Sequence, residues 1–124
     1  MRKKGLVITL TLASVFLFSS VAYAWDIIYY YTQIDHTSSE IQGYVITGTD
    51  VYADQITERG WLYMDGTFVK YNTNGNLDTT YSQCPVYYSN PSGGQDWELD
   101  GSHTATYGGI TKGPYSSYSG VYGI

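Results

Sequence analysis

The chain has 124 residues, 6 of them basic and 11 acidic, and its formal net charge is −5. This length allows one compact domain, and the acidic balance disfavours nucleic acid and anionic membranes as partners because both would repel the chain.

Residues 1–24 have the anatomy of a secretory signal peptide. Three basic residues at positions 2–4 precede a mostly apolar run over residues 6–18, and AYA at positions 22–24 fits the small-x-small cleavage rule. The apolar run is shorter than the roughly 20 residues that a membrane-spanning helix needs. We therefore expect cleavage and a secreted, extracellular protein, or a periplasmic one in a Gram-negative cell, without membrane association. The remaining 100 residues keep three basic residues and all eleven acids, for a net charge of −8.

Beyond the cleavage site, Tyr, Thr, Val, Ile and Trp dominate and glycines punctuate the chain, which favours strands. The first predicted strand covers residues 25–33, and a polar loop separates it from a second over residues 41–49. Residues 51–59 are also compatible with a short helix that Asp50 would cap, but their strand-like surroundings favour a strand. Strict alternation in the first strand places Trp25, Tyr29 and Tyr31 together on one face.

The clearest local signal is a hairpin around Asp65-Gly66, because both residues tolerate the positive φ of a type I′ turn. Pairing outward from the turn predicts Met64–Thr67, Tyr63–Phe68, Leu62–Val69 and Trp61–Lys70. One face of the hairpin would carry Leu62, Met64 and Val69. The other face would carry Trp61, Tyr63 and Phe68, so both faces are apolar.

The second half of the chain contains further strand and turn signals. Residues 72–76 (NTNGN) predict a turn, residues 77–83 and 85–88 predict strands, and residues 89–95 predict a loop. Residues 96–107 alternate so that apolar side chains and His103 fall on one face and polar ones on the other, which indicates one buried and one wet face.

Together these signals predict an all-β protein, a small antiparallel β-sandwich or small barrel of about seven short strands. Residues 25–113 would form the single β domain. Residues 114–124 would form either a Gly/Ser/Tyr-rich tail or a last edge strand.

Catalytic and metal-binding signatures are weak, and the sequence predicts no enzyme, no metal and no cofactor. Neither His36 nor His103 has a second ligand at metal spacing, and nothing local supports Cys84 with His103 as a nucleophile–base pair. Glu98 and Asp100 share one strand face, where the preferred interpretation is a solvated edge face that discourages aggregation and not an acid–base pair.

Two further polar features need interpretation. The alternating Asn72, Asn74, Asn76 and Asp78 partly match a calcium loop, but Leu77 and Gln83 occupy its glycine and acid positions, which favours a plain turn. Cys84 is the single cysteine, so the chain can form no intramolecular disulfide; the thiol is either buried or available to cross-link two chains.

Tyrosine is in excess, and residues 25–124 hold fourteen tyrosines and all three tryptophans. Such side chains either fill the core or form a binding surface for sugar rings or proteins. The leading hypothesis is a non-enzymatic domain that binds a cell-wall or extracellular polysaccharide. Its predicted contacts are Trp25, Tyr29, Tyr31, Trp61, Tyr63 and Phe68. The alternatives are a structural surface protein that self-associates through edge strands or Cys84, and a secreted bacteriocin-like or toxin effector.

Overall fold

A computed structural model describes residues 24–124, and within this range the protein has five strands and no helix. The strands are β1 (Ile27–His36), β2 (Glu40–Met64), β3 (Thr67–Ser89), β4 (Trp97–Tyr107) and β5 (Ile110–Val121). Every pairing is antiparallel, which confirms the all-β prediction. Apart from Ala24, the predicted signal peptide lies outside the described residues. Over residues 24–124, no helix has the length and apolar character to cross a membrane.

Two long, bent strands explain why five strands replace the predicted seven or so. β2 has 25 residues and β3 has 23, and their pairing shifts register between Gly48 and Ala53. Asp78 of β3 has a φ of 50° and lies within two residues of this shift, so both strands depart from regular geometry in the same region. Residues 51–59 form part of β2, in agreement with the strand interpretation.

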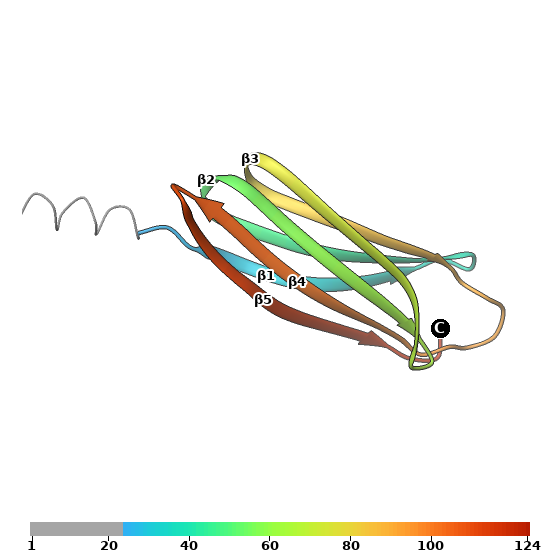
Figure 1. Ribbon diagram of the computed structural model, residues 1–124. Coiled ribbons are helices and arrows are strands. Elements are labelled where there is room, and N and C mark those ends of the chain that lie inside the picture. The colour runs from blue at the N-terminus through green and yellow to red at the C-terminus, as the bar shows by residue number, and fades with distance from the viewer. Residues whose placement is uncertain (1–23) are drawn as a thin grey trace, which may run out of the picture.

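The bends curl the single sheet into a half-barrel with two facing layers (Figure 1). The first layer contains β1 with residues 40–48 of β2 and 81–89 of β3. The second contains residues 67–79 of β3, residues 53–64 of β2, β4 and β5. At the open side, β1 and β5 meet through side chains, where Thr32 Oγ1 donates to Ser119 Oγ at 2.8 Å.

The predicted turn over residues 72–76 is wrong, because these residues continue β3. Their asparagines alternate along the strand and therefore point to the same side. The side-chain Nδ2 atom of Asn72 donates to the Pro85 carbonyl at 2.6 Å, and the Nδ2 atom of Asn74 donates to the Gln83 carbonyl at 2.8 Å. The first half of β3 is thus bonded to its second half, which closes this side of the half-barrel.

The Asp65-Gly66 turn forms as predicted, with φ values of 50° and 80°. The first two predicted pairs, Met64–Thr67 and Tyr63–Phe68, are also present. A bulge at Val69 then shifts the register, so Leu62 pairs with Lys70 and Trp61 pairs with Tyr71 in place of the predicted partners. An extra residue in one strand is the usual effect of a β-bulge, and sequence alternation does not reveal it.

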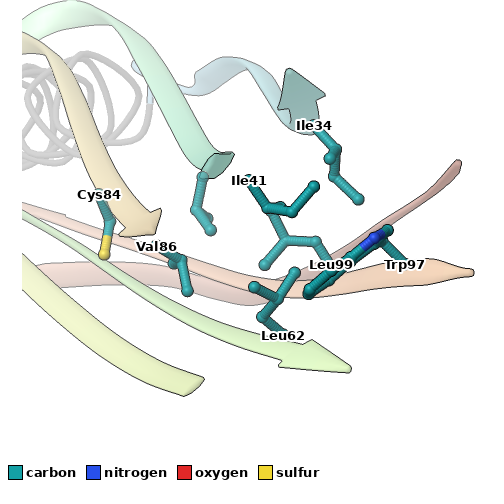
Figure 2. Close-up of a cluster of buried hydrophobic side chains, with 8 residues drawn as sticks. Ile34, Ile41, Leu62, Cys84, Val86, Trp97 and Leu99 are labelled. Atoms are coloured by element: carbon teal, nitrogen blue, oxygen red, sulfur yellow. The ribbon is translucent and has the colours of Figure 1, made fainter. Parts of the chain in front are cut away.

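The core lies between the layers in two apolar clusters. Figure 2 shows the larger cluster, in which side chains from both layers converge; its buried members are Ile34, Ile41, Val45, Leu62, Cys84, Val86, Trp97 and Leu99. The smaller cluster consists of Trp25, Ile27, Ala53, Ile56 and Ala105. Trp25, only 2% exposed, therefore belongs to the core and not to the predicted binding surface.

The C-terminal segment, which the sequence left open between a tail and an edge strand, forms most of β5 and pairs with β4. Its end is also held by the backbone, since Gln95 and Ile124 exchange two hydrogen bonds of 3.0 Å. In Figure 1 the C-terminus therefore lies beside the loop that leads into β4.

Candidate functional site

A groove of about 600 Å³ runs over the outer face of the second layer, along β4. Trp61 of β2 lies on one side, Pro114, Ser116 and Tyr118 of β5 lie on the other, and Asp100 of β4 lies between them. Its volume falls within the range of roughly 300–1,000 Å³ that is typical of small-molecule sites.

The sheet register explains how these side chains come together. Tyr71, Trp61, Asp100 and Tyr118 are cross-strand partners on β3, β2, β4 and β5. They form one row across four strands. Neighbouring strands lie about 4.8 Å apart, so Trp61 and Tyr118 flank Asp100 with a backbone separation of roughly 10 Å. The site therefore has two aromatic walls and a carboxylate between them.

Aromatic pairs hold the β2 side of this surface. The rings of Trp61 and Tyr71 have centroids 5.4 Å apart, and those of Tyr63 and Phe68 have centroids 5.9 Å apart at an interplanar angle of 68°. The predicted set Trp61, Tyr63 and Phe68 thus lies on one outer face, as the hairpin pattern indicated. Phe68 is 52% exposed, while Trp61 and Tyr63 are half-buried.

On the β5 side, the hydroxyls of Tyr118 and Tyr122 lie 3.2 Å apart. The hydrogen bond with Tyr122 is the main reason why the pKa of Tyr118 rises to about 12. Tyr118 is therefore a neutral phenol at physiological pH that uses its proton toward Tyr122, and its oxygen can accept a hydrogen bond from a ligand hydroxyl.

The predicted contacts Tyr29 and Tyr31 lie on the opposite outer face, away from Trp61. Their ring centroids are 6.2 Å apart, and the ring of Tyr29 covers Gly48 so closely that a Cβ there would lie 2.0 Å from its Cζ atom. The register of β1 shifts between Ile27 and Tyr29, so the strict alternation that joined Trp25 to these tyrosines is broken. This bulge turns Trp25 inward while Tyr29 and Tyr31 stay outside.

Glu98 and Asp100 do not lie on an edge, because β4 pairs with β2 on one side and with β5 on the other. The interpretation of these carboxylates as protection of an open edge is therefore wrong. Tyr63 and Trp61 are their partners on β2. In this position the two acids border the aromatic surface and are available to accept hydrogen bonds from a ligand.

A buried polar cluster separates the two apolar clusters of the core. Glu58 and His103 are register partners on β2 and β4, and both are fully buried. Ser82 donates to Oε1 of Glu58, while Oε2 has no hydrogen-bond partner among the described residues. Burial raises the pKa of Glu58 to about 7 and lowers that of His103 to about 4, so the interior favours the neutral form of each.

This cluster does not assemble a nucleophile–base pair. The Nδ1 atom of His103 lies 2.8 Å from Thr47 Oγ1, and its Nε2 atom lies 2.6 Å from Ser117 Oγ, so both ring nitrogens have hydroxyl partners. Cys84 is fully buried, and burial raises its pKa to about 12. Of the two alternatives that the sequence left open for Cys84, the structure therefore has the buried thiol. A thiol inside the core cannot cross-link two folded chains.

Residues 24–124 contain no group of three or more His, Cys, Asp or Glu side chains that could hold a metal ion. The asparagines that partly match a calcium loop are used by the β3 hydrogen bonds.

The sequence interpretation missed Tyr118, which lines the groove, and Arg59, which lines a neighbouring hollow of about 350 Å³. Both lie in segments that were predicted to be strands or a possible edge strand. Arg59 lies two residues before Trp61 on β2, whereas only the register between β2, β4 and β5 places Tyr118 beside Asp100 and Trp61. The alternation of Glu98 and Asp100 was a partial signal for the site, because it identified the solvent-facing side of β4.

The fold and groove define an all-β protein with a ligand-sized groove on one outer face. No protein-family model matches the chain, and no curated protein matches it. Among the solved structures that resemble it remotely are the following three. A protein from Arabidopsis thaliana has a TM-score of 0.47 and 11% identity, with 73% of this chain and 76% of that chain covered. BhCBM56 has a TM-score of 0.41 and 13% identity, with 73% and 88% covered. A protein from Archaeoglobus fulgidus has a TM-score of 0.43 and 9% identity, with 80% and 98% covered.

Proposed function

We propose that this protein is an exported, non-catalytic domain whose groove binds a polysaccharide chain. The observation that carries this proposal is the row Trp61–Asp100–Tyr118, in which a carboxylate lies between two aromatic side chains. The C–H face of a sugar ring is apolar and stacks on aromatic rings, and its hydroxyls donate to carboxylates. The groove offers both kinds of contact within one row.

Several features favour a chain-like ligand over a compact one. The groove is continuous with a second hollow of about 350 Å³ farther along β4, and both are bordered by Ser102 and Pro114. Hydroxyl side chains line this extension, namely Thr57, Ser102 and Thr104. A series of aromatic and hydroxyl groups along one direction suits successive sugars of one polymer.

Export and the absence of catalysis are part of the proposal. Residues 1–24 supply the signal-peptide pattern, and the net charge of −8 after cleavage disfavours nucleic acid and anionic lipid as ligands. Among the described residues, Asp100 is the single carboxylate that lines the groove, and His103 points into the core. This arrangement supports binding without a general acid–base pair.

The test is retention of the mature protein on insoluble chitin, cellulose and peptidoglycan, together with titration by soluble oligosaccharides of all three polymers. Trp25 and Trp97 are 2% and 0% exposed, so a ligand-dependent change in tryptophan emission would report on Trp61. We expect Trp61→Ala to lower retention at least tenfold. Tyr52→Ala is the matched control, because Tyr52 is 74% exposed and does not line the groove. No retention on any polymer, together with unchanged emission, would exclude the proposal.

A further inference from the structure

The second section of the groove contains a guanidinium group without an assigned role. Arg59 is exposed and lines this section together with Thr57, Ser102 and Thr104. Among the described residues, it is the single basic side chain that lines either section of the groove. Arg59 also has no ion-pair partner within residues 24–124, where the ion pair that forms joins Lys112 Nζ to Asp26 Oδ1 at 3.9 Å.

Arg59 and Trp61 lie two residues apart on the same strand face. Alternate residues of a strand are separated by roughly 6–7 Å, a distance that neighbouring sugars of one chain can span. A sugar stacked on Trp61 therefore places the next sugar of the chain over Arg59. The hydroxyls of Ser102 and Ser116 are the cross-strand neighbours of Arg59 in that row.

We infer that the groove selects a glycan that carries a carboxylate on the sugar next to the one stacked on Trp61. The inference rests on the proposed polysaccharide-binding function and names the chemical class of the ligand. A guanidinium presents parallel N–H donors that match the two oxygens of a carboxylate, and such charge-assisted pairs are stronger than neutral hydrogen bonds. Arg59 is the group that supplies this contact.

The acidic surroundings limit how many carboxylates the glycan can carry. Asp100 and Glu98 lie on the neighbouring strand, in the rows of Trp61 and Tyr63. They disfavour a second anionic group over the aromatic section, while a carboxylate in contact with Arg59 is one row farther from Asp100. Repulsion across that distance in water is weak and is screened by salt, whereas the carboxylate touches Arg59 directly, where the attraction is larger because the charges are closer. The preferred ligand is therefore a sparsely charged glycan, with uncharged sugars between its acidic ones.

The test compares three soluble oligosaccharides of equal length by calorimetric titration of the mature protein. The first alternates N-acetylhexosamine with uronic acid, the second is the same compound after reduction of its carboxyl groups to alcohols, and the third is a neutral chito-oligosaccharide. We expect the carboxylated compound to bind about tenfold more tightly than its reduced form. Arg59→Gln should bring the affinities for the carboxylated and reduced compounds to within about twofold of each other, and Arg59→Lys should restore only part of the difference. Lys70→Gln is the matched control, because Lys70 is exposed and lies outside the groove.

The outcomes separate the two proposals. If the wild-type protein binds the carboxylated and reduced compounds equally, the carboxylate inference is wrong while polysaccharide binding stands. If Arg59→Gln weakens all three ligands equally, Arg59 is a general contact and the selectivity is refuted. If no compound binds and no polymer retains the protein, both polysaccharide binding and carboxylate selectivity are refuted. Unchanged circular dichroism and melting temperature of each variant would show that lost binding does not reflect unfolding.

Discussion

Replacement of Glu58 by glutamine should make the protein more stable at neutral and alkaline pH, with an effect that grows as pH rises. Glu58 is fully buried, and one of its two carboxylate oxygens has no hydrogen-bond partner among the described residues. A charged carboxylate is disfavoured in such a site, which is why its pKa rises from 4.5 to about 7. Glutamine has nearly the same shape and carries no charge at any pH.

The direction and magnitude of this change in the free energy of unfolding follow from proton linkage. The folded state keeps a proton on Glu58 that the unfolded chain releases above pH 4.5, so this group contributes its full stability below pH 4.5 and loses it as pH rises to about 7. Each pKa unit corresponds to about 1.4 kcal/mol, so the loss amounts to about 3 kcal/mol. His103 acts in the opposite direction, because its pKa is lowered to about 4 and its contribution is lost as pH falls from 6.5. Both proteins contain His103, so its contribution cancels in their difference.

The assay is urea unfolding of wild-type and Glu58→Gln proteins at intervals between pH 4.5 and pH 8.5. The difference in free energy of unfolding, variant minus wild type, should rise by about 3 kcal/mol up to pH 7 and stay level above it. A constant offset from the altered hydrogen bond with Ser82 does not affect this slope. A difference that is independent of pH would show that Glu58 does not titrate in the buried site and would refute the reasoning.

Three further predictions concern packing, hydrogen bonding and the thiol. In a urea titration, Gly60→Ala should lower the free energy of unfolding by about 1–3 kcal/mol, because a Cβ there would lie 2.6 Å from a methyl group of Val86. Gly75→Ala is the control and should change the free energy of unfolding little, because the atom nearest to a Cβ there lies at 3.4 Å. Asn74→Ala should lower the free energy of unfolding by about 1 kcal/mol in the same titration, since it removes a 2.8 Å hydrogen bond between the two halves of β3. A stability equal to that of the wild type would argue against that bond. The Cys84 thiol, fully buried, should react with an aromatic disulfide reagent only after unfolding in guanidinium chloride, and rapid reaction of the folded protein would contradict its placement in the core.

Local pattern was sufficient for much of the secondary structure. Side-chain alternation identified the strand that became β4, and the Asp65-Gly66 pair identified its turn because the required φ values depend on those two residues alone. The prediction that Trp61, Tyr63 and Phe68 share a hairpin face held for the same reason, since these residues lie within a few positions of the turn.

Features that depend on residues far apart in the sequence could not be predicted from the local pattern. The bulge before Tyr29 and the one at Val69 each insert a residue that alternation cannot reveal, and the first of them moved Trp25 from a predicted contact into the core. The asparagines of residues 72–76 look like a turn in isolation. They form a strand because their backbone pairs with residues 56–60 of β2, while backbone carbonyls 9 to 13 residues away accept hydrogen bonds from the side chains of Asn72 and Asn74.

Composition and alternation alone thus establish an acidic, tyrosine-rich, antiparallel β protein with a signal-peptide pattern at its start. The groove was decided by tertiary structure, because Trp61, Asp100 and Tyr118 belong to three strands and become neighbours only through cross-strand register. Register is set by the bends of β2 and β3 and by packing of the two layers, and these are properties of the whole sheet. A residue's side of a strand can be read locally, whereas its neighbour across the sheet cannot.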